Sequence, residues 1–500
     1  MTVSDSLILG LKVSLDPANL LFCFIGVLVG TLIGVLPGIG PVGTISILLP
    51  IIAKLTPVSG IIMLAGIYYG AQYGGSTTSI LVNIPGEASS VITCLEGYQM
   101  ARRGRAGPAL GIAAIASFIA GTCGVLGLSL LALPLSEFAL KFGPPEYFSL
   151  MILAIIMLVY LAQGSTIKAL MMATLGLILS SIGMDRVTGD LRFTFDLLGL
   201  SDGIGLVPMV MGLFGLSEVL INVERMASKE ILETKIKNLL PTWQDWMRAK
   251  WAIGRGTFIG FLLGILPGAG PVISTFVSYT VEKRISKEPE KFGTGMIEGV
   301  AGPEAANNAA VQASFVPLLT LGIPPNPTTA ILLGALMILG LQPGPLLMKN
   351  HPDFFWGIVV SMYIGNAMLL VLNLPLIPLW VQVLRVPYHI LFPLIILFCL
   401  IGSYSLNNYI FDVYVMIIFG IFGYLMRKYK YEGAPLVMTF VLGPLMELAL
   451  RRSLIISGGS FSIFWTRPIS AAILIVAFTL VVVSIAMNLK PKKKSPQSPS

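Results

Sequence analysis

A carboxylate and two amides stand close together in an otherwise apolar stretch, "GPEAANNAAVQAS" at residues 302–314. Glu304, Asn307 and Asn308 are spaced three and four residues apart, which places them on one face of a helix. Intramembrane carboxylates are often functional but are also often neutralised, so two interpretations of Glu304 stay open. It is either a helix-capping or helix-pairing residue, or it forms a coupling-ion site with Asn307 and Asn308.

Two breaks with nearly the same sequence interrupt apolar runs. "GVLPGIGPVG" begins at Gly34 and "GILPGAGPVI" begins 230 residues later, and seven of the nine positions from Gly34 to Val42 recur. Proline removes a backbone donor and glycine adopts conformations closed to other residues, so each segment predicts a helix, a break and a second helix. The N–H groups at such a break suit a carboxylate, and the carbonyl groups suit Na⁺. The predicted substrate-binding residues here are Gly38, Gly40, Thr44, Gly268, Gly270 and Ser274.

A second pair of breaks is flanked by hydroxyl groups. "GGSTTSILVNIPGEASS" (74–90) corresponds to "GIPPNPTT" (322–329) in its last eight residues, at a separation of 239. Small residues also pack membrane helices closely, which is the simpler interpretation for any isolated glycine. Matched breaks with polar neighbours favour a binding site instead. The residues added to the predicted substrate site are Ser76, Thr77, Thr78, Asn83, Gly86 and Thr328.

Several other kinds of chemistry are excluded by the same residues. Gly38, Gly40 and Gly43 match G-x-G-x-x-G, but no acidic residue follows before Gly86 and the second copy has Ile273 at the third position. The sequence contains no phosphate-binding G-x-x-x-x-G-K-[ST], no H-E-x-x-H and no G-x-S-x-G, and its four cysteines have no metal-ligand spacing. We therefore expect no enzyme and no cofactor, with either Na⁺ or H⁺ as the coupling ion.

The elements that carry these residues are membrane helices. The chain is 55% hydrophobic and 11% charged, whereas ordinary soluble domains are about 25% charged. Several apolar stretches exceed the roughly 18–20 residues that cross a bilayer. This predicts an all-α polytopic membrane protein with about 10–12 membrane segments, including broken or re-entrant helices. The start has no basic region and no cleavage site, so no removable signal peptide is expected. The charge-poor apolar stretches are 107–133, 147–163, 169–183, 204–222, 357–384, 390–402, 409–426 and 468–489.

The repeat and the charges together predict the domain organisation. Basic residues gather at 101–105, 225–255, 282–291, 427–430 and 490–494, which the positive-inside rule explains as cytoplasmic loops; the aromatic-lined basic face of a nucleic-acid-binding domain is missing. The flanks of the second copy are basic and those of the first are not, which predicts two copies of opposite orientation. This arrangement places Arg451 and Arg452 on the outer side of the membrane, against the positive-inside rule. The predicted units are an N-terminal segment 1–19, a first repeat 20–222, a cytoplasmic linker 223–250, a second repeat 251–447, a C-terminal helix 468–489 and a disordered basic tail 490–500.

Several long motifs resemble one known family. "GVLPGIGP", "YYGAQYGGSTTSILVNIPGE", "FGTGMIEGVAGPEAANNA" and "PLLTLGIP" are similar to the large membrane subunit of the tripartite tricarboxylate transporters, the TctA family. The resemblance covers roughly residues 20–450. One departure is Pro325, where the family pattern usually has a glycine.

The resemblance implies a permease of the bacterial inner membrane, driven by an ion gradient. Its implied partners are a small membrane subunit of about four helices and a periplasmic solute-binding protein that delivers a carboxylate. The implied substrates include citrate, other carboxylates and some aromatic acids. The alternative is a stand-alone ion-coupled transporter of carboxylates or cations.

Overall fold

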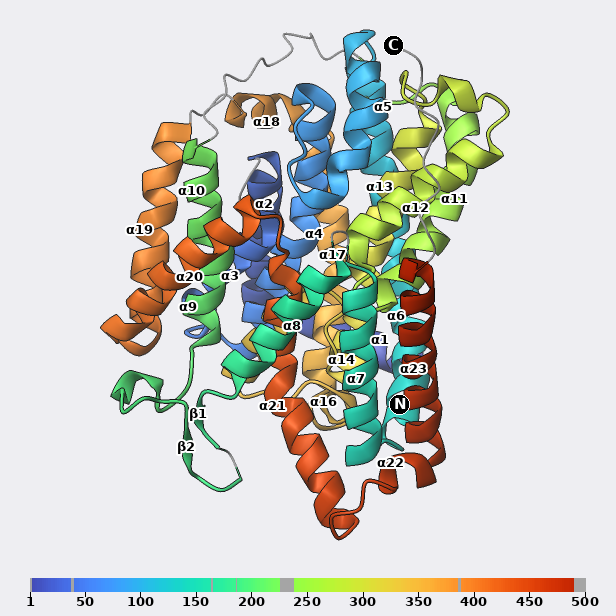
Figure 1. The fold of residues 1–500 in the computed structure, drawn as a ribbon. Coiled ribbons are helices and arrows are strands. Elements are labelled where there is room, and N and C mark those ends of the chain that lie inside the picture. Colours follow the sequence, from blue (N-terminus) through green and yellow to red (C-terminus); the bar gives the residue numbers. More distant parts are fainter. Residues whose placement is uncertain are drawn as a thin grey trace.

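The chain folds into a bundle of helices. The computed structural model describes residues 2–36, 40–162, 165–185, 187–224, 238–384 and 388–489, and Figure 1 shows the course of the chain. Among these residues, six helices are long and apolar enough to cross a membrane: Pro17–Val35, Ala106–Ala139, Leu206–Glu224, Pro352–Asn373, Ile410–Lys428 and Gly433–Ile456. Six shorter apolar helices accompany them. The predicted all-α, multi-pass membrane class is confirmed.

The elements follow one another in two series. The first comprises α1 (Val3–Ser14), α2 (Pro17–Val35), α3 (Gly40–Ile52), α4 (Pro57–Val82), η1 (Ala88–Ser90), α5 (Val91–Arg102), α6 (Ala106–Ala139), α7 (Pro144–Tyr160), α8 (Thr166–Ser180), β1 (Gly183–Met184), β2 (Leu191–Arg192), η2 (Leu198–Leu200), α9 (Leu206–Val210), η3 (Met211–Leu216) and α10 (Ser217–Glu224). The second comprises α11 (Trp243–Ile265), α12 (Gly270–Ile285), η4 (Pro289–Lys291), α13 (Glu298–Ala313), α14 (Phe315–Leu321), α15 (Pro327–Ile338), α16 (Pro345–Asn350), α17 (Pro352–Asn373), α18 (Ile377–Val383), α19 (Tyr388–Asn407), α20 (Ile410–Lys428), α21 (Gly433–Ile456), α22 (Ile463–Thr466) and α23 (Pro468–Leu489).

Helix boundaries follow local sequence signals. Helix α11 begins at Trp243, inside the predicted linker, because Thr242 and Asp245 form a capping box. Helix α4 ends where Asn83 adopts a left-handed conformation with φ 57°. The predicted apolar stretch 357–384 is divided into α17 and α18 by a turn.

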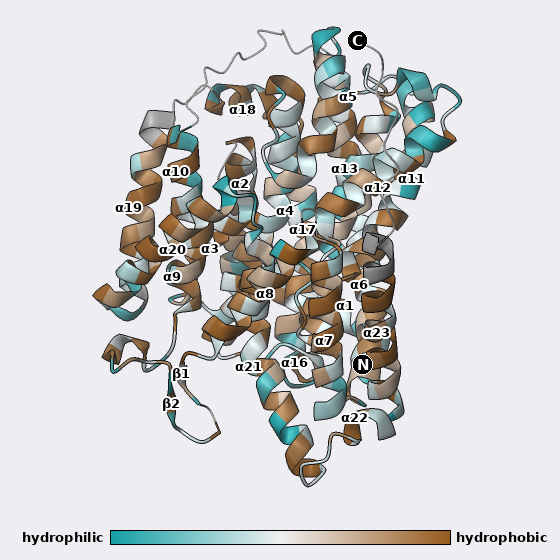
Figure 2. Cartoon of the chain, in the orientation of Figure 1, coloured by the Kyte–Doolittle hydropathy of each residue, from teal (hydrophilic) through white to brown (hydrophobic). Residues whose placement is uncertain are grey.

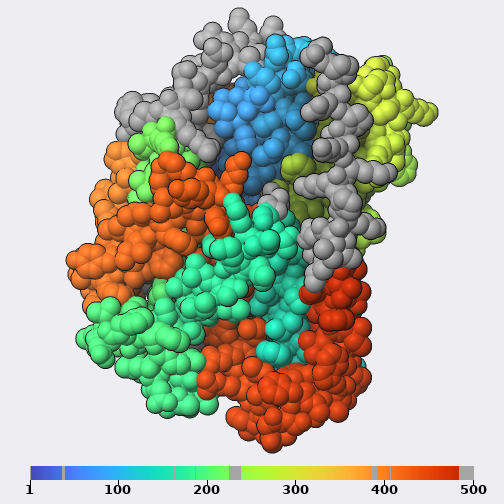
Figure 3. Space-filling view, viewed as in Figure 1, coloured from blue at the N-terminus to red at the C-terminus, as the bar shows by residue number. Residues whose placement is uncertain are grey.

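The molecule has two polar ends. One end of the molecule, which we call the linker end, contains the C-terminal ends of α5 and α10, the start of α11 and the segment between α12 and α13 (Figure 1). The β1–β2 hairpin, α16 and α22 lie at the opposite end, the hairpin end. Hydrophilic residues gather toward these ends and apolar residues dominate between them (Figure 2). On the face shown in Figure 3, α7 and α8 lie beside the C-terminal helices, and α21 packs against both while α23 packs against α7.

Glycines allow α2 and α4 to pack with their backbones in contact. Gly26, Gly30 and Gly34 recur every fourth residue of α2, and a Cβ at any of them would overlap the α4 backbone at Met63, Ile67 or Ala71. Close approach of this kind is typical of membrane helices, which gain stability from packing rather than from exclusion of water.

The second series repeats this contact between α11 and α13. Gly256, Gly260 and Gly264 of α11 meet the backbone of α13 at Gly302, Ala306 and Ala310. The three glycines lie 230 residues after those of α2, and their contacts lie 239 residues after those on α4. The two separations are the same as those of the sequence breaks.

A short connection follows α4 and α14 in the same manner. In the first, Glu87 and Ser90 form a capping box at η1; in the second, Asn326 and Thr329 form one at α15. Gly322 ends α14 with φ 71°, at the position equivalent to Asn83. We call residues 83–87 and 322–326 the crossing loops. The first brings Glu87 back beside Gly75 of α4, and the second brings Pro325 and Asn326 beside Gly268 and Gly270 of the second break.

Candidate functional site

Glu304 lies at the centre of a buried polar network. Its carboxylate accepts hydrogen bonds from Ser76 Oγ at 2.6 Å, from Ser117 Oγ at 3.4 Å and from Thr93 Oγ1. These donors lie on α4, α6 and α5, and each of the four side chains is at most 4% exposed. Asn308, one turn along α13, donates to Ser117 Oγ at 2.7 Å. The polar face predicted for residues 304–308 therefore faces the first series of helices.

A second carboxylate extends the network through the first crossing loop. Ser89 Oγ lies 2.8 Å from Asn307 Oδ1 and also donates to Glu87. Asn307 Nδ2 lies 3.5 Å from Glu87 Oε1. The side-chain amide of Gln72, turned with its nitrogen toward this group, lies 2.9 Å from Glu87 Oε1. Asn307 thus contacts Glu87, as Glu304 contacts Ser76.

The network is acidic and has no basic partner. None of the ion pairs among the described residues involves Glu87 or Glu304. A buried carboxylate must be paired, coordinated or neutralised, because an isolated charge in an apolar interior is very costly. Hydroxyl and amide groups supply part of this stabilisation. The arrangement is suited to binding a proton or a small hard cation, whose preferred ligands are oxygen atoms.

A third acidic residue fixes the start of α13. Glu96 of α5 is fully buried, and its carboxylate accepts from the backbone N–H groups of Gly293, Gly295 and Met296, and from Tyr279 Oη at 2.9 Å. Gly293 and Gly295 have φ of 93° and 105°, which directs successive N–H groups to one point. Glu96 thereby joins α5 to the segment that begins the Glu304 helix.

The described glycines of the matched breaks have positive φ, and their polar groups are partly used in internal hydrogen bonds. Gly40 and Gly270 begin α3 and α12 with φ of 64° and 53°. Thr44 and Ser274 donate to the carbonyl groups of these glycines at 2.8 Å and 2.7 Å. The N–H of Gly268, at φ 83°, donates to Pro325 O at 2.8 Å. Gly38 lies outside the described residues.

The other predicted substrate residues have separate positions. Thr78 donates to Val35 O at 2.7 Å, and a Cβ at Gly86 would overlap Gly34 and Gly75. Asn83 is exposed at the end of α4. Thr328 is buried in the first turn of α15, and Thr77 lines a small cavity between α4, α6 and α17. Of the predicted substrate residues that the structure describes, Ser76 alone hydrogen-bonds to the Glu304 network.

Sequence reasoning missed several members of this network. Gln72, Glu87, Ser89, Thr93 and Ser117 are not among the residues predicted from the sequence. Ser117 is one isolated serine in a long apolar helix, so its sequence carries no signal. Ser89 lies within the hydroxyl-rich stretch 74–90 and Gln72 lies two residues before it, and both could have been included because buried polar groups need partners.

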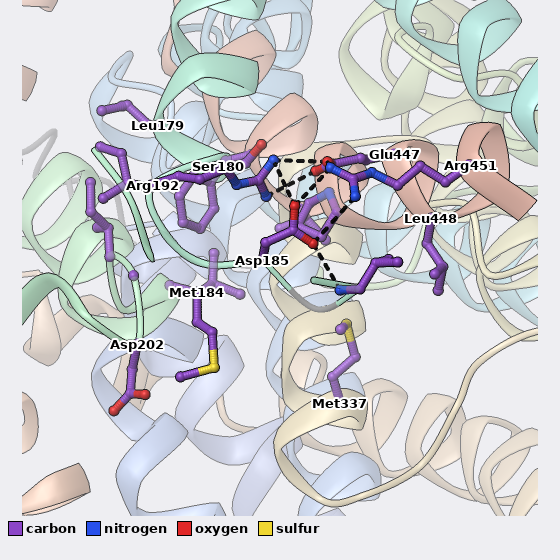
Figure 4. Close-up of a pocket in the computed structure, with 18 residues that line it drawn as sticks. Leu179, Ser180, Met184, Asp185, Arg192, Asp202, Met337, Glu447, Leu448 and Arg451 are labelled. Atoms are coloured by element: carbon purple, nitrogen blue, oxygen red, sulfur yellow. Dashed lines mark hydrogen bonds and ion pairs between the residues drawn. The ribbon is translucent and has the colours of Figure 1, made fainter. Parts of the chain in front are cut away.

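A separate cluster of charges lines a cavity of about 410 Å³ at the hairpin end (Figure 4). Arg192 of β2 lies 2.8 Å from Glu447 of α21, and Arg451 lies 2.7 Å from Asp185 and 2.6 Å from Glu447. The N–H groups of Val187 and Thr188, with Arg451 and Arg192, hold the pKa of Asp185 below its usual range despite its burial. The cluster holds the hairpin against α21. It also pairs Arg451, whose position the predicted charge pattern did not explain, with Asp185 and Glu447. The full set of contacts comprises Asp185, Val187, Thr188, Arg192, Glu447 and Arg451.

Comparison with known proteins identifies the family. The model of the "Tripartite tricarboxylate transporter TctA family" matches residues 20–438. A protein of Agrobacterium vitis described as "Uncharacterized 52.8 kDa protein in TAR-I ttuC' 3'region" is 50% identical over 493 residues, which is 99% of this chain and 98% of that protein. A second protein of the same organism, "Uncharacterized protein in TAR-II ttuC' 3'region", is 52% identical over 234 residues, covering 47% of this chain and 97% of its own length. No solved structure matches the chain.

The family match spans both crossing loops, the second "LPG-x-GP" break and the whole of the Glu304 network. The name of the family describes components of tripartite transport systems, which gives the chain a role in transport. Its long apolar helices agree with a multi-pass membrane protein. The chain belongs to the tripartite tricarboxylate transporter TctA family.

Proposed function

We propose that this chain is the large permease subunit of a tripartite, binding-protein-dependent system that imports tricarboxylates or related carboxylates across the bacterial inner membrane. A gradient of Na⁺ or H⁺ drives the uptake. The partners in this proposal are a small membrane subunit of about four helices and a periplasmic solute-binding protein.

The observation that carries the proposal is the buried network around Glu304. Two carboxylates, Glu87 and Glu304, share it with amide and hydroxyl groups, and no described basic side chain pairs with either of them. A group of this kind in a membrane protein indicates a path for ions or protons. Glu304, Asn307 and Asn308 are the proposed coupling-ion residues.

The proposal includes an alternating-access mechanism carried out by two similar units of opposite orientation, and repeated helix contacts support their similarity. The glycine contacts of α2 with α4 and of α11 with α13 keep the two sequence separations, and both crossing loops end in a capping box. Transporters built from inverted repeats bind their substrates at broken helices near the repeat interface. Residues 20–222 and 251–447 are the two proposed units.

The proposed substrate position is the region between the breaks. Helix α12, which follows the second break, packs against η1 after the first crossing loop, and α3 packs in turn against α15 after the second. The N–H of Gly268, in the second break, already donates to Pro325 O in the crossing loop of its own unit. A carboxylate would therefore accept from the N–H groups that begin α3 and α12.

Reconstitution of uptake tests the proposal. The chain is placed in proteoliposomes with its small membrane subunit, and loaded binding protein is added outside while Na⁺ and proton gradients are imposed separately. Carboxylate uptake should require the binding protein and one of the two gradients. Uptake that needs no binding protein would favour the stand-alone alternative, and purification from the native membrane without a small partner would support it further.

Glycine substitutions at the breaks test the substrate position. Gly270→Val should abolish uptake, because a branched side chain opposes φ 53° and would lie beside Asn326. Gly40→Val should do the same at φ 64°, although no atom lies within 4 Å of the added Cβ. Gly254→Val on α11, where the added Cβ also meets nothing, is the matched control. Normal uptake by a well-folded Gly270→Val protein would remove the second break from the substrate site.

A further inference from the structure

A small cavity adjoins the Glu304 network on the side away from Glu87. It has a volume of about 10 Å³ and lies between α4, α6 and α17, which is room for about one water molecule or one dehydrated ion. Its polar lining consists of Tyr73, Ser76, Thr77, Ser117 and Asn373. Two of these, Ser76 and Ser117, donate to Glu304 Oε2, so the cavity lies directly behind the hydroxyls that contact the carboxylate.

One amide oxygen of a residue that lines the cavity has no partner, and a second such oxygen belongs to a residue bonded to the lining. Asn373 is 4% exposed, and its amide nitrogen donates to Leu369 O at 3.0 Å. This contact fixes the orientation of the amide and leaves Asn373 Oδ1 buried without a hydrogen bond. Asn308, which is 1% exposed, also has a buried Oδ1 without a partner while its nitrogen donates to Ser117. Buried acceptors of this kind are rare, and each one needs an explanation such as a bound ion or water.

The polar atoms that line the cavity are mainly oxygen atoms that can accept hydrogen bonds or bind a cation. Ser76, Thr77 and Ser117 contribute hydroxyl oxygens, Asn373 contributes its free Oδ1, and Glu304 contributes negative charge one hydrogen bond away. A water molecule would satisfy Asn373 Oδ1 but would leave the charge of Glu304 uncompensated. A cation would satisfy both.

We infer that this cavity is a binding site for a dehydrated monovalent cation, with Na⁺ as the ion whose size and preference for oxygen fit it. Ser76, Thr77, Ser117 and Asn373 are its ligands, and Glu304 supplies the balancing charge. The inference deepens the proposed ion-driven uptake and rests on it for its physiological role. It adds Thr77, Ser117 and Asn373 as cation ligands.

Binding of Na⁺ to the purified full-length chain tests the site without any transport. Thermal unfolding is followed in detergent while NaCl replaces choline chloride at constant ionic strength. A ligand that binds only the folded state stabilises it by RT ln(1 + [L]/Kd), so the unfolding temperature begins to rise once the ligand concentration approaches Kd. The wild-type chain should be stabilised by Na⁺. Thr77→Val keeps the shape of the side chain and removes its oxygen, so the Na⁺ concentration at which the unfolding temperature begins to rise should increase about tenfold for a change of ~1.4 kcal/mol. Asn373→Leu should raise it at least as much.

Ser129→Ala is the matched control. Ser129 is a buried hydroxyl on α6, three turns from Ser117, and it bonds Val125 O at 2.8 Å and Tyr363 Oη at 3.2 Å, away from the cavity. Its Na⁺ response should equal that of the wild type. If Thr77→Val and Asn373→Leu respond to Na⁺ as the wild type does, or if the wild type shows no response, the cavity holds water only and the inference fails. Proton-driven uptake without any Na⁺ effect would overturn this site and leave the permease function intact. A Na⁺ response of the purified chain without carboxylate uptake would support this site and contradict the permease function.

Discussion

Replacing Glu304 with glutamine should separate substrate uptake from its dependence on Na⁺. The substitution keeps the length and shape of the side chain, so α13 should retain its packing against α4 and α11. It removes the charge from a group that accepts hydrogen bonds from Ser76, Thr93 and Ser117. One of the two oxygens becomes an NH₂ group that can no longer accept.

The size of the effect follows from these contacts. A hydrogen bond to a charged group contributes about 1.5–3 kcal/mol, whereas one between neutral groups contributes about 0.5–1.5 kcal/mol. Losing the charge of Glu304, which balances that of the cation through the hydroxyls between them, should therefore cost ~1.5–3 kcal/mol, which is a ten- to hundredfold fall in Na⁺ affinity. The effect on folding should be smaller, because a neutral amide is less costly to bury than a carboxylate.

The assay is uptake by proteoliposomes at increasing external Na⁺, with the binding protein saturated by substrate. We expect Glu304→Gln to need ten to a hundred times more Na⁺ for half-maximal uptake, or to lose the Na⁺ response altogether. Glu298→Gln is the matched control, since Glu298 is the first residue of the same helix and pairs with Arg248 at 2.7 Å. Unchanged Na⁺ dependence in a normally expressed Glu304→Gln protein would refute the coupling role and leave Glu304 as a helix-pairing residue.

Three further outcomes are expected. Glu96→Gln turns an NH₂ group toward backbone N–H donors, so it should lower the free energy of unfolding by about 1–3 kcal/mol, measured by thermal unfolding; an unchanged transition would contradict the anchoring role. Because the pKa of Asp185 is depressed in the folded state, its contribution to stability is present above the unfolded value of about 3.9 and is lost as the pH falls through the folded value. Proteolysis of the hairpin should therefore increase only below about pH 4. Arg451→Gln should move the onset of proteolysis to higher pH. An unchanged onset would show that the Arg451–Asp185 ion pair does not set this pH dependence. Single cysteines at Lys287 and Gly189, in a chain without its four native cysteines, should be labelled from opposite sides of the membrane, with position 287 cytoplasmic, and labelling of both from one side would refute the inverted orientation.

Several features of this protein are determined by the sequence alone. Composition and the length of the apolar runs are sufficient for a multi-pass helical protein, because any helix that crosses a bilayer must be apolar over its whole length. Local signals also place many boundaries, including the Pro–Gly breaks before Gly40 and Gly270, where the backbone has positive φ. The spacing of Glu304, Asn307 and Asn308 is enough to align them on one helix face. These properties depend on residues that are neighbours in the chain.

The tertiary structure decided which residues complete the network. Ser76, Ser117 and Asn373 lie on three different helices, and no local pattern relates Ser117 or Asn373 to Glu304. Ser76 and Ser117 come within hydrogen-bond distance of Glu304 only because α4 and α6 pack against α13. A linear sequence specifies which groups need partners. Only the packing of helices decides which groups come within the few ångströms that a hydrogen bond or a bound ion requires.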